Sequence, residues 1–157
     1  MKFLVTKDLA HSSLLANLMS AVVFVLLFYL GLDVVLHGYV IGFDIPSLQS
    51  TLYGNAENFE EPMLIDALLL QVHIDLFMTL FAVLILSSVY IRLFPKNKRT
   101  KKVVHAVFIS GMTAPPALLL AYFTNMFFAY IWLVSFAVWH LSAVLMGLRI
   151  LKKLLLK

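Results

Sequence analysis

The stretch Met63–Lys102 constrains this chain more than any other part of its sequence. Residues 63–94 are apolar over about 48 Å at a helical rise of ~1.5 Å per residue, which exceeds the ~30 Å hydrocarbon core of a bilayer. From Arg92 to Lys102 follow six Lys and Arg residues with no acidic residue between them. A long apolar segment that ends in a basic loop is typical of a spanning helix that ends at the cytoplasmic surface.

The composition indicates how many such segments the chain holds. Of its 157 residues, 62% are hydrophobic, whereas a soluble domain is nearer half apolar. Because a spanning helix needs about 20 apolar residues, the chain has room for about four spans in a single domain, 1–157. The predicted fold class is an all-α integral membrane four-helix bundle. Its spans are predicted at residues 13–36, 63–94, 103–123 and 127–148.

The distribution of charge predicts how the bundle is oriented. Two Lys residues precede the first span, six Lys and Arg lie between the second and third, and four follow the fourth. The long connection, residues 37–62, carries four acidic residues and no base. The positive-inside rule therefore predicts cytoplasmic N- and C-termini and an external loop 37–62. We expect a multi-pass protein of the bacterial inner membrane. The net charge of +4 comes from the basic residues that orient the protein in the lipid bilayer. It is therefore no sign of nucleic-acid binding, and we expect no nucleic-acid partner.

Within the external loop, turn residues predict a short interfacial helix. In PSLQSTLYG, Ser47 is the predicted N-cap and Gly54 the predicted end. Further along, Asn58 is predicted to cap the second span, with Pro62 in its first turn.

Two features of the last spans bear on their packing. Pro115 and Pro116 lack backbone N–H groups, so the third span is predicted to be kinked. In the fourth span Ala143 and Gly147 are four residues apart, which allows close helix approach. We therefore expect a homo-oligomer or a membrane complex that uses this face.

Several kinds of chemistry are excluded by what the sequence lacks. There is no cysteine, so disulfides, thiolate zinc sites and cysteine-bound iron–sulfur clusters are ruled out. The sequence contains no Walker loop, nucleophile elbow or Gly-rich dinucleotide motif. Hydrolase and nucleotide-driven functions have no support.

Five histidines are the main candidates for a functional site. Counting the helical rise from the basic residues places His37 and His73 near the outer boundary. The same count places His11 and His105 near the inner surface and His140 near the middle. Paired imidazoles from different helices are what bis-histidine haem ligation needs. His73 is the first predicted ligand, His37 its partner, and His140 the fallback.

Acceptors for the free ring N–H of such ligands are also present. Asp33 precedes His37 by four residues, so the two share a face if the helix continues that far. Asp75 or Gln71 would serve His73 in the same way.

The same residues allow a site without haem. Asp66 and His73 are seven residues apart and share a helix face, whereas Asp75 points elsewhere. With Asp33 and His37 they would form a cluster that binds a divalent metal or relays protons. The alternatives are that Asp66 is solvated near the outer end of its helix, and that the histidines only pack.

The size, the four spans and the histidines on several helices resemble the membrane b-type cytochromes, with an architecture similar to cytochrome b561. That resemblance implies haem b, electron transfer or small redox-ligand handling, and quinone or another redox partner. An enzyme of this kind would be a quinone-linked membrane redox protein. Two other functions remain open: a non-haem metal- or proton-handling transporter or channel, and an accessory subunit of a membrane complex.

Overall fold

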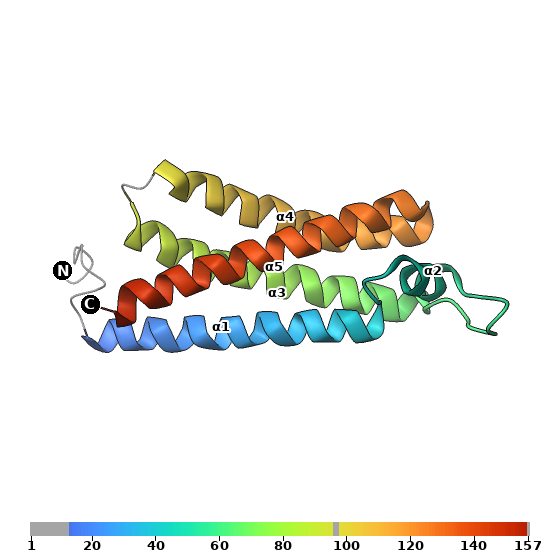
Figure 1. The fold of residues 1–157 in the computed structure, drawn as a ribbon, viewed down its shortest axis with the longest axis horizontal. Helices are drawn as coiled ribbons and strands as arrows, with labels where there is room; N and C mark the ends of the chain where they lie inside the picture. Colours follow the sequence, from blue (N-terminus) through green and yellow to red (C-terminus); the bar gives the residue numbers. More distant parts are fainter. Residues whose placement is uncertain (1–12, 96–97, 157) are drawn as a thin grey trace.

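The computed structural model describes residues 13–95 and 98–156, and within them the chain is helical apart from its connections. The helices are α1 (Ser13–Val40), α2 (Ile45–Tyr53), α3 (Ile65–Leu93), α4 (Lys98–Phe123) and α5 (Met126–Leu155), shown in Figure 1. All but α2 are long and apolar enough to cross a membrane. The predicted all-α membrane bundle is therefore confirmed.

Helix α5 is the centre of the bundle, because it packs against α1, α3 and α4. The start of α1, the end of α3, the start of α4 and the end of α5 lie at one end of the molecule (Figure 1). Helix α2 and the turn between α4 and α5 lie at the other end. The arrangement is the one that the predicted topology requires, while the side of the membrane on which each end lies stays a prediction.

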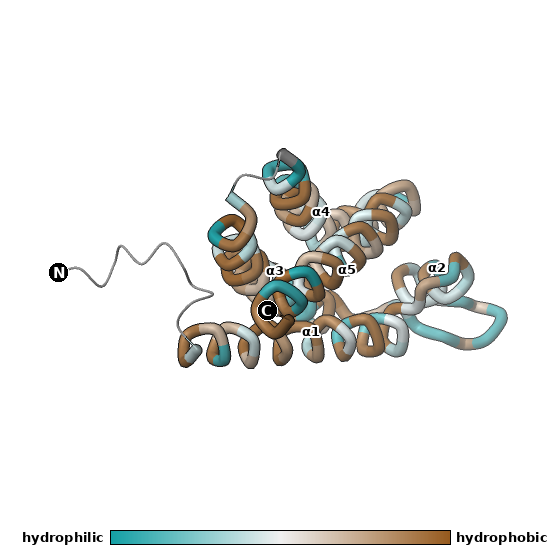
Figure 2. Tube along the Cα trace, turned by 60° about the vertical axis from the view of Figure 1, so that its left-hand side comes forward, coloured by the Kyte–Doolittle hydropathy of each residue, from teal (hydrophilic) through white to brown (hydrophobic). Residues whose placement is uncertain are grey.

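Polar residues follow the same division. Figure 2 shows hydrophilic residues at the helix ends and in the loop beside α2, and hydrophobic residues along most of each long helix. The basic end, as we call it below, carries exposed Arg92, Lys101, Lys102, Lys152 and Lys153.

Three of the spanning helices, α1, α4 and α5, extend beyond the spans that hydropathy predicted. Helix α1 continues to Val40, α4 begins at Lys98, and α5 continues to Leu155. Hydropathy marks only where a segment can lie in hydrocarbon, whereas the backbone ladder continues through charged helix formers into the headgroup region. Lys152 and Lys153 also lie in the last turn of α5, where a positive charge is favourable to the helix dipole.

Helix α2 forms where a short helix was predicted, but its cap is Asp44 and not Ser47. The Asp44 carboxylate accepts hydrogen bonds from the Ser47 backbone N–H at 3.0 Å and from its hydroxyl at 2.7 Å. These bonds hold the pKa of Asp44 below its ordinary value of 3.8. Pro46 occupies the first turn, and Gly54 ends the helix with φ of 79°, as expected for a residue without Cβ.

Helix α3 begins later than predicted. Its N-cap is Leu64, which makes no side-chain capping bond, so the predicted cap at Asn58 is wrong and Pro62 lies before the helix. The Asn55 side chain instead accepts the backbone N–H of Glu57, and its backbone pairs with Glu60. Asn58 also donates its backbone N–H to this Asn55 side chain at 3.4 Å, so it belongs to the turn and not to the start of α3.

Helix α4 runs through Pro115 and Pro116 as one element. Pro115 is buried against the bundle and Pro116 is exposed. The predicted kink at this pair stays a prediction.

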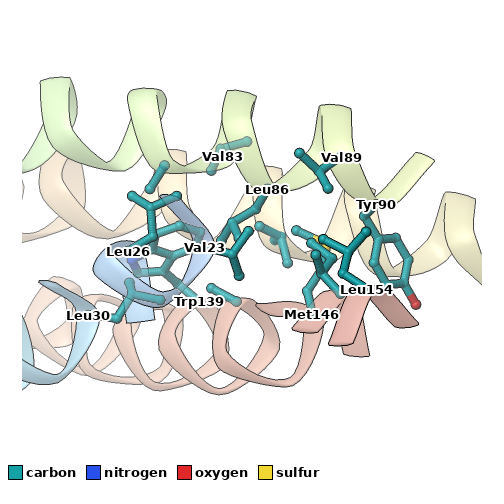
Figure 3. Packing of buried hydrophobic residues seen from close by; sticks show 14 of the residues in the cluster. Val23, Leu26, Leu30, Val83, Leu86, Val89, Tyr90, Trp139, Met146 and Leu154 are labelled. Carbon is teal, nitrogen blue, oxygen red and sulfur yellow. The ribbon is translucent and has the colours of Figure 1, made fainter. Parts of the chain in front are cut away.

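The core consists of two apolar clusters along the bundle axis. The cluster nearer the basic end gathers side chains from α1, α3 and α5, among them Leu26, Leu86 and Met146 (Figure 3). The second surrounds Trp132 and Phe136 and includes residues of α2. The polar residues of the candidate site lie beside this second cluster, because His37 contacts both aromatic rings.

The small residues of α5 pack inside the chain. Ala143 is fully buried, and a Cβ at Gly147 would lie 2.7 Å from Cδ2 of Leu27 on α1. Gly147 therefore permits the close approach of α1 and α5. The face that was predicted to join copies of the chain is used within one copy, and oligomerisation through another face stays a prediction.

Candidate functional site

The candidate site is centred on His37, whose side chain is 1% exposed near the end of α1. Its Nδ1 donates to the Asp33 backbone oxygen at 2.9 Å, one helical turn earlier. Its Nε2 lies 3.0 Å from Oδ2 of Asp75 on α3. The imidazole thus joins two helices and is held at both nitrogens.

Helix α3 presents a polar stripe to this histidine. Gln71, Asp75 and Thr79 are spaced four residues apart, so they share one face. Gln71 donates to Asp75 Oδ1 at 2.8 Å, and its Nε2 lies 3.5 Å from His37 Nε2. The amide therefore fixes the orientation of the Asp75 carboxylate.

Helix α5 extends the arrangement through His140. Its Nδ1 donates to the Phe136 backbone oxygen at 2.9 Å, and its Nε2 lies 3.0 Å from Oδ2 of Asp33. The Asp33 carboxylate thus contacts both histidines, with Oδ2 beside His140 Nε2 and Oδ1 3.4 Å from His37 Nδ1, in addition to the backbone contact with His37. The side chains of His140, Asp33, His37, Asp75 and Gln71 are called the polar chain below.

Counting donors and acceptors assigns the protons of the polar chain. In His37 and His140, Nδ1 faces a backbone carbonyl oxygen, which can only accept, so Nδ1 carries hydrogen. Each Nε2 faces a carboxylate oxygen, so one proton is shared across each imidazole–carboxylate contact. Two buried carboxylates are thereby balanced by two protons.

Aromatic rings separate the polar chain from the rest of the bundle. The Phe136 ring centroid lies 4.7 Å from that of His37 and 4.0 Å from that of His140. Trp132 is 1% exposed and lies beside the same histidine. Electrostatic interactions are stronger in such apolar surroundings than in water.

A small cavity adjoins Asp33, His37, Asp75 and Thr79. Its volume is about 10 Å³, close to what one water or one ion requires. One ligand atom from each of Asp33, His37 and Asp75 lies within 4.8 Å of the other two. These three residues could hold a metal ion, and His140 lies close enough to Asp33 to support it.

The other predicted site residues lie elsewhere. His73 is exposed on α3, because it is two residues, or about 200° of helix rotation, from buried Asp75. The predicted pair of His73 with His37 is therefore corrected: the partner of His37 is Asp75. The predicted cluster with Asp66 is corrected for the same reason. Asp66 is exposed and accepts the Ala67 N–H, which agrees with the alternative of a solvated carboxylate.

Of the remaining two histidines, only His105 lies among the described residues, and it is not part of the polar chain. His105 is exposed on α4, where its Nδ1 donates to the Lys101 backbone oxygen at 2.7 Å. His11 lies outside the described residues.

The residues of the site do not fit a haem. Ligand sites usually enclose roughly 300–1,000 Å³, whereas the cavity beside His37 measures about 10 Å³. The Nε2 atoms of His37 and His140 both face carboxylates of the polar chain, so neither is directed at an open space. Haem binding stays a prediction from the sequence and gains no support from this geometry.

Sequence reasoning found all five members of the polar chain as candidates and placed Asp33 beside His37, but it assigned Gln71 and Asp75 to His73 and gave His140 no partner. The signal that was available is the four-residue spacing of Gln71, Asp75 and Thr79, which marks the polar face of residues 63–94 and leaves His73 off it. No comparable signal links Asp33 to His140, because that contact depends on how α1 and α5 pack.

The fold and the site define a multi-pass integral membrane protein with a buried histidine–carboxylate cluster. The chain belongs to the Aq_1264_TM family, described as a transmembrane helical domain, whose family model matches residues 42–157. The match includes Gln71, Asp75 and His140, while Asp33 and His37 precede it. Comparison with curated proteins and with solved structures gave no match.

Proposed function

We propose that this protein binds one divalent transition-metal ion within the membrane through Asp33, His37 and Asp75. The observation that carries the proposal is that ligand atoms of these residues, from two helices, lie within 4.8 Å of one another. Bonds to zinc are about 2.0–2.2 Å long, which separates the ligand atoms of a tetrahedral shell by roughly 3.3–3.6 Å. Small side-chain rotations would close the site around an ion.

The imidazole of His37 is already prepared for such a role. Its Nδ1–H is held by the Asp33 backbone oxygen, which leaves Nε2 as the atom that can bind a metal. His140 has the same arrangement with the Phe136 oxygen, so it would either orient Asp33 or supply a fourth ligand. A second partner on each histidine is typical of metal ligands in proteins.

Charge balance favours a divalent ion. Asp33 and Asp75 are mostly buried, and the hydrogen-bond partners of their side chains are histidines and Gln71. One divalent cation would neutralise both carboxylates and replace the two shared protons. An uncompensated charge at this place would be costly, because the site is enclosed by helices that cross the bilayer.

The ligand types narrow the choice of metal. Imidazole nitrogen with carboxylate oxygen suits zinc, iron, nickel or copper, whereas magnesium and calcium prefer oxygen ligands alone. We therefore take Zn²⁺ as the probe. The proposal places the site in the bacterial inner membrane, where helical bundles with basic cytoplasmic loops are found, near the end that carries α2.

A second candidate is a proton relay that needs no metal. It is favoured by the series of imidazole–carboxylate contacts from His140 through Asp33 and His37 to Asp75, in which Asp33 Oδ1 lies 3.4 Å from His37 Nδ1. Ionisable residues within membrane spans often conduct protons in this way.

The metal content of the purified protein distinguishes the metal site from the proton relay. The protein would be stripped with a chelator, dialysed against Zn²⁺ in detergent and analysed for zinc. The proposal expects one zinc per chain, lost in Asp75→Asn and His37→Ala. His73→Ala and Asp66→Asn are matched controls, because both residues are exposed on the same helix as Asp75, and both should keep the zinc. Uptake that is absent, or equal in Asp75→Asn and wild type, would overturn the metal site and leave the proton relay.

A further inference from the structure

A second feature lies at the basic end, away from the polar chain. There α3 and α4 border an open groove of about 340 Å³. Its wall includes Leu84, Ser88 and Ile91 of α3 and Val104, His105 and Phe108 of α4. Leu84, Ile91 and Phe108 are about half exposed, at 57%, 48% and 47%. Since both helices span the membrane, this apolar groove faces lipid.

Two basic side chains, Arg92 and Lys101, lie near the end of the groove that is closest to the basic end of the molecule. Arg92 follows Ser88 by four residues on α3, and Lys101 precedes His105 by four on α4. Each basic residue therefore lies on the same helix face as the groove, one turn nearer the basic end. Both side chains are exposed. Arg92 lies in the last turn of α3 and Lys101 in the first turn of α4, and these two helix ends lie at the same end of the molecule (Figure 1).

We propose that this groove binds an anionic phospholipid, with an acyl chain against Leu84 and Phe108 and the phosphate between Arg92 and Lys101. Arginine and lysine are the usual protein ligands of phosphate. Anionic lipids are enriched in the cytoplasmic leaflet, on the side that the positive-inside rule assigns to this end. This lipid site is independent of the metal site.

Charge also decides between a lipid and a second copy of the chain. A twofold contact through the groove would bring Arg92 and Lys101 of one copy close to the same residues of the other. Like charges that face each other across an interface repel. An anionic headgroup removes that conflict and leaves the apolar wall covered.

Quenching of tryptophan fluorescence by brominated lipids tests the proposal. In Phe108→Trp, the new ring reports on lipid in the groove, while the native Trp132 and Trp139 are buried and supply a constant background. The protein would be placed in phosphatidylcholine vesicles that contain brominated phosphatidylglycerol or brominated phosphatidylcholine. Each basic residue near an anionic surface contributes about fivefold in affinity, so we expect at least a fivefold preference for phosphatidylglycerol.

Matched variants make the result decisive. Phe24→Trp places the probe on a lipid-facing position of α1, 66% exposed and about as far from its helix start as Phe108, and should show no preference. Arg92→Gln with Lys101→Gln should reduce the preference at Phe108→Trp to about one. If Phe108→Trp does not fold, Ile91→Trp reports on the same groove. Equal quenching by both lipids would overturn the proposal. So would a preference that survives loss of both charges, or a probe that neither lipid quenches because another copy covers it.

Discussion

Replacing His37 and Asp75 by leucine, singly and together, tests how strongly the polar chain holds α1 against α3. The two side chains meet at 3.0 Å and are 1% and 9% exposed. Removal of one partner leaves the other buried without its main contact. Removal of both leaves an apolar contact between the helices, so the double substitution should cost less than the sum of the two single ones.

The expected magnitude follows from this burial. A full charge pair at 3.0 Å is attracted by about 5.5 kcal/mol at an effective dielectric constant of 20, and desolvation opposes much of that. Each single substitution should lower the free energy of unfolding by about 3 kcal/mol, the lower end of the range for broken buried pairs. The lower end applies because Asp75 keeps its contact with Gln71 when His37 is lost, and His37 keeps its contact with Asp33 when Asp75 is lost. We expect a coupling energy of about 2 kcal/mol, above the ~0.6 kcal/mol that is average for interhelical hydrogen bonds in membranes.

The coupling can be measured by unfolding in mixed micelles with increasing dodecyl sulfate, with chelator present so that no metal contributes. Trp132, whose ring centroid lies 6.2 Å from that of His37, provides a fluorescence signal at the site. A control cycle pairs Asp75→Leu with His105→Leu on exposed α4 surface and should give coupling near zero. A coupling below about 0.5 kcal/mol for His37 and Asp75 would refute the reasoning, because it would mean that the contact contributes no more than a weak interhelical hydrogen bond.

Three further predictions concern the fold. Gly147→Leu should lower the free energy of unfolding by about 1–3 kcal/mol, because α1 approaches closely there, while Gly31→Leu, with open space around its Cα, should change it little in the same assay. Cysteines at Asn58 and Lys101, both exposed, should react with impermeant reagents from opposite sides of the membrane, and labelling from the same side would contradict the topology. Asp44→Ala should speed hydrogen exchange in the first turn of α2. Because hydrogen bonds lower the pKa of Asp44, its cap should persist at pH 5 and weaken only as pH falls below its ordinary value of 3.8. Protection factors in this turn, which are corrected for the intrinsic pH dependence of amide exchange, should be lower at pH 3 than at pH 5, and equal values would contradict this.

The spans could be predicted from the sequence because hydropathy is summed over about 20 residues and does not depend on neighbours. The cap of α2 could not be, because Asp44 and Ser47 are both good capping residues three positions apart. Which of them caps depends on where the helix begins, and Pro46 in its first turn favours the earlier start.

The contacts of the candidate site were also difficult to predict from local sequence. His73 and Asp75 are both costly in a span. Because they are two positions apart on the helix, they point in nearly opposite directions and cannot both face the interior. Burial of Leu68, Val72 and Thr79 determines that Asp75 faces inward. The partner of Asp75 then depends on the rotation of α1 about its own axis, which no local pattern in residues 13–40 specifies. The members of the polar chain were therefore predictable as candidates, and so was the contact of Asp33 with His37 within α1, but the contacts between helices were not.

X-ray absorption at the zinc edge tests the metal site most directly, because it reports the ligands of the ion. For zinc-loaded protein, we predict a shell of nitrogen and oxygen at about 2.0–2.1 Å, outer scattering from at least one imidazole, and no sulfur. The imidazole scattering should weaken in His37→Ala and be unchanged in His73→Ala. A shell of oxygen alone, or imidazole scattering that disappears in His73→Ala and persists in His37→Ala, would contradict a metal site at Asp33, His37 and Asp75.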